Sequence, residues 1–379
     1  MKITCQSPVN IAVIKYWGKE NVELNLPTNG SISVTLSMEH IKTITCVESN
    51  EQIKQDSLVL NGELVEIPGR MKLVIDKMRN IAIRCGNRQI KYKSESPLES
   101  PADPRHFITI KSRNTFPTAA GLASSASGYS CLVYCLSLLY HLDAYLTRTE
   151  LSEFARLGSG SSCRSLFPGL VEWHLGDSSS TSVADSICDS WEDLDILVCI
   201  VKSEKKKVGS TVGMQQTVKS SALFKHRVEG MPAKLETMKR AIIAKDFETF
   251  ANLTMADSNQ FHAVCLDTFP PIIYLNEDSR WFIEFVHEYN RMAGETAVAY
   301  TFDAGPNPVL YMRSKYTGDV VRLLKQLVDV TKFKSIRDFN ECVTIVNELG
   351  ENIPKTNIPV EIIHAKCGAG PSLCKEEGI

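Results

Sequence analysis

The stretch Phe116–Gly128 reads FPTAAGLASSASG and consists almost wholly of small side chains. It lies between a strand-like run, Phe107–Ile110, and a long apolar helical run, Ser127–Tyr140. Small side chains let the backbone approach a ligand closely, and N–H groups at a helix start point outward with the positive end of the helix dipole. The stretch therefore predicts a phosphate-binding loop. It matches neither GxxxxGKS/T nor GxGxxG, and a tight turn packed on a sheet is the alternative interpretation.

Outward from this stretch, the first half of the chain mixes strand-like and helical patterns without strict alternation. We expect a further strand at Thr43–Val47 and helices at Met71–Ala82 and Glu150–Arg156. The Ser-rich segment Asp177–Ser190 is interpreted as a mobile loop and a domain seam. The chain is therefore predicted to be α+β, with one domain over residues 1–190 and a second over residues 191–379.

The second half shows a buried strand, three helical patterns and two short β-rich runs. They are expected at Asp195–Val201, then at Lys234–Ala244, Phe247–Ala256 and Asp278–Met292, and then at Ala297–Phe302 and Val309–Met312. Gly294 suits the end of the last helix, because glycine tolerates the left-handed conformation. A turn-rich loop between the last two runs presents Asp303.

The composition is that of an ordinary globular protein. Hydrophobic residues make up 43% and charged residues 23% of 379 positions, which argues against disorder, collagen and coiled coil. Lys plus Arg number 42 against 44 Asp plus Glu, a formal charge of -2. No global basic field therefore draws the chain to nucleic acid or anionic lipid, and an anionic ligand needs a local cluster of cations.

Several features indicate a cytoplasmic protein and no membrane segment. The first residues carry Lys2 and Gln6 among apolar positions and form no signal-peptide core. The most apolar window, Tyr129–Leu146, contains polar side chains that would be costly in lipid, so we interpret it as a buried helix. The 12 cysteines include no CxxC, and the closest two, Cys131 and Cys135, share one helix face. Reduced core thiols are expected.

Two further segments carry candidate binding groups. Asn10–Lys19, NIAVIKYWGK, is an apolar run followed by an expected turn that contains two lysines and two aromatic residues. Pairs of surface lysines are common, so this pattern alone is not specific. Gly158–Ser165, GSGSSCRS, brings hydroxyls and a guanidinium together, and Arg can grip a carboxylate or phosphate with two parallel hydrogen bonds. As an isolated motif, the second segment also fits a solvated linker.

These three segments, followed in the chain by Asp303-Ala304-Gly305-Pro306-Asn307, resemble the mevalonate diphosphate decarboxylases of the GHMP kinase superfamily. The likeness runs from Ser7 to about Met312, and Ser127 and Ser162 replace alanines that are usual in the family. The resemblance implies a two-lobed GHMP kinase fold, α+β, with a ribosomal protein S5 domain 2-like N-terminal lobe, an α/β sandwich C-terminal lobe and a site in the cleft. It also implies a homodimer.

The activity that the resemblance implies is the ATP-dependent conversion of mevalonate 5-diphosphate to isopentenyl diphosphate, CO₂, ADP and phosphate. Asp303 is the expected catalytic carboxylate, Lys15 is expected to lie near it, and Arg164 is expected on the substrate carboxylate. An Asp that caps its own turn is the alternative interpretation of Asp303. A small-molecule kinase of the same superfamily and a noncatalytic family member are the competing functions.

The remaining site residues are also expected from the resemblance. Substrate contacts are assigned to Asn10, Tyr16, Trp17, Gly18, Lys19, Arg70, Ser159, Gly160, Ser161, Ser162, Cys163, Arg164, Ser210 and Thr211, with Tyr16, Lys19 and Arg70 on the diphosphate. ATP contacts are assigned to Pro117, Ala120, Gly121, Leu122, Ala123, Ser124, Ser125 and Ala126, and Ser124 is the candidate Mg²⁺ ligand. Few protein ligands are needed, because Mg²⁺ prefers phosphate oxygens and keeps several waters.

Two other patterns are interpreted as structural. His262 and Cys265 have no second pair of ligands nearby in the sequence and fit a packed helix end. Trp281, Phe282 and Tyr289 recur at helical spacing and are expected in the core.

Overall fold

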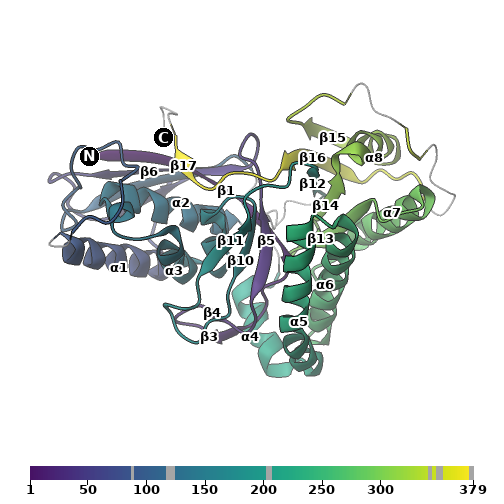
Figure 1. Cartoon of the computed structure of the whole chain (residues 1–379), viewed down its shortest axis with the longest axis horizontal. Helices are drawn as coiled ribbons and strands as arrows, with labels where there is room; N and C mark the ends of the chain where they lie inside the picture. Colours follow the sequence, from purple (N-terminus) through teal and green to yellow (C-terminus); the bar gives the residue numbers. More distant parts are fainter. Residues whose placement is uncertain (87–88, 117–123, 202–206, 340–343, 347–352, 375–379) are drawn as a thin grey trace.

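The computed structural model describes residues 1–86, 89–116, 124–201, 207–339, 344–346 and 353–374 of the chain. Two lobes lie along the long axis of the molecule, each with its own sheet and helices, and a third sheet lies where they meet (Figure 1). The predicted α+β class is confirmed. None of the helices in these ranges is both long and apolar enough to cross a lipid bilayer.

The first lobe is a six-stranded sheet with helices on one face (Figure 1). The strand order is β17-β1-β6-β9-β7-β8. These strands are β1 (Lys2–Pro8), β6 (Lys42–Ser49), β7 (Ser57–Leu60), β8 (Glu63–Val65), β9 (Ile108–Asn114) and β17 (Ser372–Leu373), and the helices are α1 (Gly69–Cys85), α2 (Ser124–Leu139) and α3 (Arg148–Gly158). The strands predicted from residues 43 and 107 and the three predicted helices are confirmed.

Helix α2 is buried along most of its length, as its apolar sequence predicts. It packs on β1 and β6. The Cys131 thiol donates to the carbonyl of Cys5 at 3.3 Å, and the Cys135 thiol donates to the carbonyl of Thr45 at 3.2 Å. Both cysteines are free, in agreement with the expected reduced core thiols.

A four-stranded sheet forms the layer between the lobes, with the order β11-β10-β5-β2. Its strands are β2 (Asn10–Ile14), β5 (Ser31–Thr35), β10 (Leu170–Trp173) and β11 (Ala184–Cys188). Every residue of β2, β5 and β10 is buried. Ile11 and Val34 join the core of the second lobe, whereas Val171 and Trp173 join the core of the first. The lobes therefore share a sheet that is covered on both faces.

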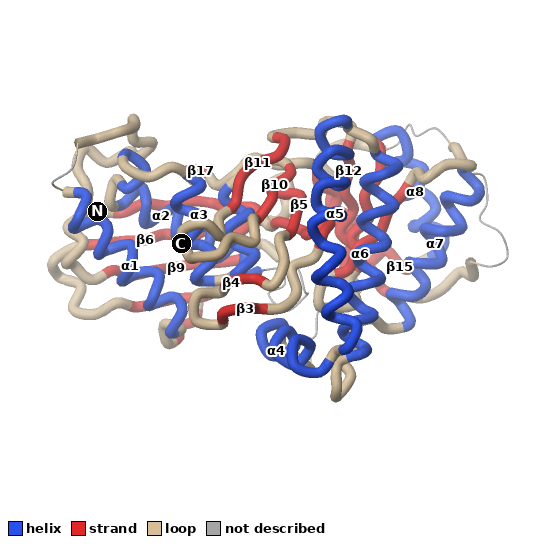
Figure 2. The backbone as a smooth tube through the Cα atoms, turned by 60° about the horizontal axis from the view of Figure 1, so that its bottom comes forward, coloured by secondary structure: helices blue, strands red, loops and turns tan. Residues whose placement is uncertain are grey.

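The second lobe holds a five-stranded sheet of order β13-β14-β12-β16-β15. The strands are β12 (Leu194–Ile200), β13 (Val298–Phe302), β14 (Pro308–Arg313), β15 (Asp329–Lys334) and β16 (Pro359–Lys366), and the helices are α4 (Ser210–Ser220), α5 (Ala222–Ala244), α6 (Phe247–Asp267), α7 (Glu277–Ala293) and α8 (Ser314–Leu327). Figure 2 shows α5 and α6 side by side near the boundary between the lobes. All the strands and helices predicted here are present.

Two structural interpretations of the second half are confirmed in detail. Gly294 ends α7 at φ 72°, a left-handed conformation that glycine adopts without strain. Trp281, Phe282 and Tyr289 lie in the core of the second lobe. His262 lies on α6, and no group of three or more potential metal ligands occurs in the described part of the chain.

The interpretation of Asp177–Ser190 as a loop is wrong for its second half. Residues Ala184–Cys188 form β11: Ala184 is buried, and the strand pairs antiparallel with β10, with one register shift next to Leu170. The end of the chain also departs from a simple two-part division: β17 returns to the first lobe and pairs with β1. The boundary after residue 190 stays a prediction.

Candidate active site

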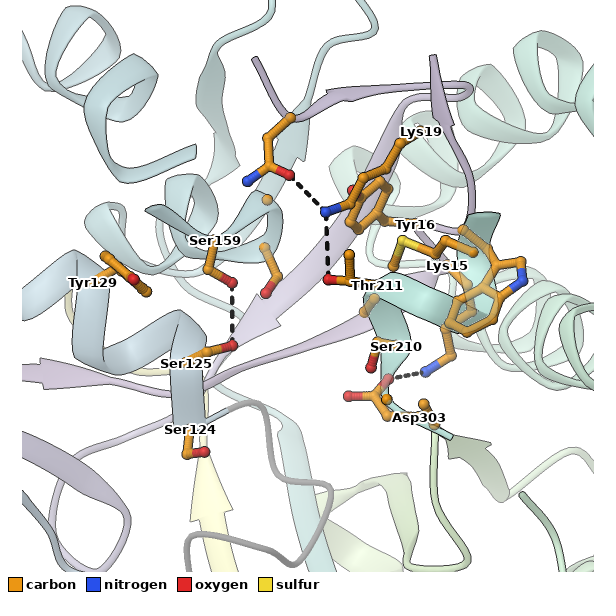
Figure 3. Close-up of a pocket in the computed structure, with 18 of the residues that line it drawn as sticks. Lys15, Tyr16, Lys19, Ser124, Ser125, Tyr129, Ser159, Ser210, Thr211 and Asp303 are labelled. Carbon is orange, nitrogen blue, oxygen red and sulfur yellow. Dashed lines mark hydrogen bonds and ion pairs between the residues drawn. The ribbon is translucent and has the colours of Figure 1, made fainter. Parts of the chain in front are cut away.

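A cavity of about 810 Å³ opens between the lobes. Its walls come from the segment that follows β2, the start of α2, the 3₁₀ segment η2 (Gly160–Leu166), the start of α4 and the turn that holds Asp303 (Figure 3). Most of the described residues of the predicted site therefore converge from both lobes on one space.

Lys15 and Asp303 face each other across the lobe boundary. Lys15 directly follows β2, its side chain is 3% exposed, and its Nζ donates to Asp303 Oδ1 at 2.7 Å (Figure 3). Burial lowers the pKa of the Lys15 ammonium, and the Asp303 carboxylate opposes part of that shift. The Asp303 side chain is 27% exposed and lines the cavity. The predicted proximity of the two residues is confirmed.

The turn that presents Asp303 joins β13 to β14 and is held from several sides. The Gly305 amide donates to the Asp303 carbonyl at 2.7 Å, and Asn307 Oδ1 accepts from the Val201 amide at 2.9 Å. Within the described residues, the hydrogen bond of the Asp303 carboxylate goes to Lys15 and not to its own turn. The structure thus favours a carboxylate aimed at the cavity over a turn cap.

Arg164 is a buried cation with neutral partners. Its Nε donates to Ser33 Oγ at 2.9 Å, and its Nη1 donates to Ser31 Oγ at 2.6 Å. The guanidinium lies over the Trp173 ring, 5.6 Å from the ring centroid. Burial lowers its pKa, although Arg stays charged at any physiological pH. No carboxylate among the described residues forms a salt bridge with Arg164. The buried guanidinium therefore lacks an anionic partner there, and a buried charge without one is costly.

The rest of the GSGSSCRS segment divides into two groups. Ser159, Gly160 and Ser161 line the cavity, as does Asn10, whose amide donates to the Ser161 carbonyl at 2.9 Å. Ser162 and Cys163 do not line it, because their side chains bond the backbone of their own turn and are buried.

Trp17 and Gly18 also differ in their placement. Trp17 lines the cavity, and its indole N–H donates to Thr217 Oγ1 at 3.0 Å. Gly18 lies behind the wall at φ +98°, where a Cβ atom would meet Thr28 at 2.4 Å. This glycine is required by the turn, whatever else it contacts.

Lys19, Tyr16 and Arg70 also line the cavity, and the Arg70 charge acts on both of the other side chains. Lys19 Nζ donates to Asn25 Oδ1 at 2.7 Å and approaches Thr211 Oγ1 at 3.5 Å (Figure 3). Burial, with a smaller effect of the nearby Arg70 charge, lowers the Lys19 pKa to about 8. Arg70 donates to the carbonyls of Leu157 and Val22. Both cations are therefore held by neutral oxygens.

The predicted phosphate loop is described only from its helical end. Pro117, Ala120, Gly121, Leu122 and Ala123 lie outside the described residues. Ser124 and Ser125 open α2 and line the cavity, and Ser125 Oγ lies 3.1 Å from Ser159 Oγ (Figure 3). Ala126 is buried beneath them. Ser210 and Thr211 open α4 on the facing wall, so two helix N-termini point their positive dipole ends at the cavity.

The charge of the cavity wall is strongly one-sided. Among the described residues that line the cavity, Asp303 has the sole carboxylate, and the other charged side chains are lysines and arginines. Such a wall attracts a polyanion, and the pair formed by the buried Lys15 and the partly exposed Asp303 lies in the same wall.

Two family models match consecutive parts of the chain. Residues 7–184 match the diphosphomevalonate decarboxylase-like N-terminal domain, and residues 196–374 match the mevalonate 5-diphosphate decarboxylase C-terminal domain. The chain belongs to the diphosphomevalonate decarboxylase family. The family predicted from the sequence motifs is therefore confirmed.

Known diphosphomevalonate decarboxylases resemble the chain over nearly its whole length. The one from Schizosaccharomyces pombe is 43% identical and aligns with 98% of this chain and 93% of its own. A solved structure of mevalonate diphosphate decarboxylase from Trypanosoma brucei is 34% identical, covers 100% of both chains and has a TM-score of 0.88. Another, described as MDDEF in complex with MVAPP, AMPPCP and magnesium, is 28% identical, covers 99% of both chains and has a TM-score of 0.76.

Several residues that hold the cationic side chains of this decarboxylase family member were not predicted from its sequence. Asn25 holds the Lys19 ammonium, and Ser31 and Ser33 hold the Arg164 guanidinium. Asn25 adopts φ 54°, a left-handed conformation that Asn tolerates better than most residues. Its position in a short turn after Lys19 was a usable signal. The two serines lie on a buried strand, where nothing in the sequence distinguishes them from packing residues.

Proposed function

We propose that this chain catalyses the ATP-dependent decarboxylation of (R)-mevalonate 5-diphosphate to isopentenyl diphosphate, CO₂, ADP and phosphate. This reaction belongs to the mevalonate pathway of isoprenoid and sterol biosynthesis. Besides membership of the family, one observation supports it above the others. Among the described residues that line the cavity, Asp303 has the sole carboxylate; it is paired with the buried Lys15, and the other charged groups are cations.

The chemistry explains why such a wall is needed. A tertiary hydroxyl is a poor leaving group, so its oxygen first takes the γ-phosphoryl group of ATP and gives up its proton. The C–O bond then breaks and phosphate leaves with the electron pair. The bond to the carboxylate breaks next, CO₂ leaves, and its electrons form the new double bond. Triphosphate, diphosphate and carboxylate meet in this space, and their charges need cations close by.

Asp303 is assigned to the 3-hydroxyl, which it orients and deprotonates. The carboxylate is partly open to the cavity, and its Oδ1 is held by Lys15 Nζ. A carboxylate within hydrogen-bond reach of the hydroxyl is the requirement for general-base work. Lys15 holds that carboxylate in place through the hydrogen bond from its ammonium group.

Arg164 is assigned to the substrate carboxylate. Its bonds to the chain use Nε and Nη1, and within the described residues Nη2 has no partner. Ser159 and Ser161 also line the cavity and can add hydroxyl donors. A ligand carboxylate would supply the negative partner that the buried guanidinium lacks.

Tyr16, Lys19 and Arg70 are assigned to the diphosphate. All three line the cavity, and the Arg70 charge acts on Tyr16 and on Lys19. The Tyr16 hydroxyl is buried without a hydrogen-bond partner in the described structure, which suits a phosphate oxygen as acceptor. Burial raises the pKa of that phenol, so it remains a donor at neutral pH.

ATP and Mg²⁺ are assigned to the start of α2. Hydroxyls of Ser124 and Ser125 and the N-terminal end of α2 suit triphosphate oxygens, and Ser124 would hold Mg²⁺ together with them. Ser210 and Thr211 face them from α4. When bound there, the metal ion would neutralise charge on the phosphates. The relative described with MVAPP, AMPPCP and magnesium supports this set of ligands.

We further propose that the chain functions as a homodimer in the cytoplasm. The dimer rests on the family resemblance, and light scattering coupled to gel filtration would test it. The compartment is supported by the free thiols of the described cysteines, most of which are buried. Fractionation of cells that express the chain would test the location.

The proposed reaction is tested by product stoichiometry. Purified protein is incubated with Mg-ATP and mevalonate 5-diphosphate, and ADP, phosphate and CO₂ are measured together. Equal yields of the three are expected. ADP with a stable phosphorylated product and no CO₂ would place the chain with the small-molecule kinases instead.

A further inference from the structure

The backbone of Lys15 is held by side chains from the second lobe. Pairing between β2 and β5 ends at Ile14, so the next amide and carbonyl lie beyond the ladder. The Lys15 amide donates to Asp257 Oδ2 at 2.7 Å, and the Lys15 carbonyl accepts from Arg227 Nη2 at 3.2 Å. Asn29 Nδ2 also donates to that carbonyl, at 3.0 Å. Both backbone polar groups of Lys15, its amide and its carbonyl, are thus hydrogen-bonded to side chains.

Arg227 and Asp257 form a closed, buried ion pair. Arg227 Nη1 and Nη2 each lie 3.0 Å from an oxygen of Asp257, and both side chains are 0% exposed. Lys234 Nζ adds a third bond to Asp257 Oδ1 at 2.7 Å. Burial of two charges costs free energy that their attraction often fails to exceed, so stability is a weak explanation for the pair. Its contacts with Lys15 offer a better one.

The residue after Asp257 holds the strand that leads to Asp303. Ser258 Oγ accepts from the Phe302 amide at 3.1 Å, one position before Asp303. Asp257 and Ser258 are both fully buried on α6. Asp257 and Ser258 are adjacent on one helix. Asp257 therefore fixes the backbone of Lys15, and Ser258 fixes the end of the strand that leads to Asp303.

We propose that Asp257 and Ser258, with Arg227, are positioning residues that set the placement of Lys15 relative to Asp303. The inference rests on the proposed function, because it gives that pair a task in phosphoryl transfer. A helix is a rigid spacer, and a small displacement of reacting groups costs up to about 100-fold in rate. Loss of the hydrogen bond from the Lys15 amide to Asp257, or of the one from the Phe302 amide to Ser258, is expected to lower turnover. The binding of mevalonate diphosphate and ATP should not weaken.

The first test compares two variants of α6 that each remove one buried hydroxyl. Ser258→Ala frees the Phe302 amide, and alanine does not weaken a helix. Thr254→Val is the matched control, since Thr254 Oγ1 is buried and its one hydrogen bond within the described residues goes to the Phe250 carbonyl of its own helix. We expect Ser258→Ala to lower kcat by about 10- to 100-fold with each KM within about twofold. Thr254→Val should leave kcat unchanged. Equal kcat in the two variants would overturn the proposal.

The second test compares two buried carboxylates of the second lobe. Asp257→Asn keeps an oxygen for the Lys15 amide but loses the charge that holds Arg227. Asp319→Asn is the control, because Asp319 is also 0% exposed, binds Arg322 at 2.7 Å and accepts a backbone amide from Val346 at 3.0 Å. Both should lower the melting temperature, but only Asp257→Asn should lower kcat. A kcat loss shared by both would make the ion pair merely structural and contradict the proposal.

These outcomes are separable from failure of the proposed function. A wild-type protein that releases no CO₂ would contradict that function, whatever the variants do. A wild type with full activity and an equally active Ser258→Ala variant would contradict the positioning role alone.

Discussion

Lys15 Nζ and Asp303 Oδ1 lie 2.7 Å apart, although 288 positions separate the two residues in the chain. They come from different lobes, so the ion pair exists only when the lobes are assembled. Its lysine is almost fully buried, whereas its carboxylate is 27% exposed. The exposed member is the one that can meet a substrate hydroxyl.

Asp303→Asn is expected to abolish most turnover and to spare binding. The amide keeps the shape of the side chain but loses the charge that accepts a proton, and general-base catalysis contributes about 100- to 10,000-fold. Calorimetry should show mevalonate diphosphate binding with nearly normal affinity. Asp103→Asn, at a surface pair with Arg105, is the control and should leave kcat unchanged. A variant at position 303 with normal kcat would remove Asp303 from the mechanism.

Arg164→Lys is expected to lower kcat/KM for mevalonate diphosphate by about 10- to 100-fold. An ammonium cannot reproduce the fork that reaches Ser31, Ser33 and a ligand carboxylate together, and a charged hydrogen bond contributes about 1.5–3 kcal/mol. Arg79→Lys is the matched control, because Arg79 forms its two-bond pair with Asp56 inside the first lobe. That variant should lose stability and keep its kcat/KM. Equal kcat/KM in the two variants would argue against recognition of a carboxylate by Arg164.

Affinity for the diphosphate is expected to fall as pH rises through about 8, the pKa to which burial lowers Lys19. A lowered pKa means that the ammonium loses its proton above that pH, and the neutral amine binds anions poorly. kcat should vary less, because a bound diphosphate favours the protonated form. The pH profile of kcat/KM measures the effect, and Lys19→Arg should remove the alkaline fall because arginine stays charged. An identical fall in that variant would assign it to another group.

Removal of metal ions is expected to stop activity and to leave the fold intact. Mg²⁺ is usually bound through one or two protein ligands together with substrate phosphates, so the metal should arrive with the nucleotide. With excess EDTA, CO₂ release should cease while the melting temperature of the free protein stays within about 1 °C. A marked drop in melting temperature would indicate a structural metal ion.

Local patterns made much of the fold predictable from the sequence. Helix α7 follows from the spacing of Trp281 and Tyr289 and from Gly294 at its end, because each is a local requirement of a helix. The start of α2 is also predicted, from the stretch of small residues around it. The turn at Asp303 is predicted from the glycine and prolines that follow it. The family resemblance then related these segments to one another, which no periodicity could do.

Long-range partners were beyond sequence reasoning. Strand β11 forms by backbone hydrogen bonding to β10. Strand β17 likewise pairs with β1, which lies at the opposite end of the sequence. Ser31 and Ser33 acquire a role only when Arg164 packs beside them. Such contacts depend on the assembled sheets and leave no mark on local composition.

The most direct test of the account follows the oxygen of the 3-hydroxyl. Mevalonate 5-diphosphate labelled with ¹⁸O at that position is converted with Mg-ATP, and the phosphate released is analysed by mass spectrometry. If the hydroxyl is phosphorylated and then leaves, each phosphate should contain one ¹⁸O atom, in an amount equal to the CO₂ formed. Unlabelled phosphate would show that ATP is hydrolysed by water and would contradict phosphorylation of the hydroxyl as the route to decarboxylation.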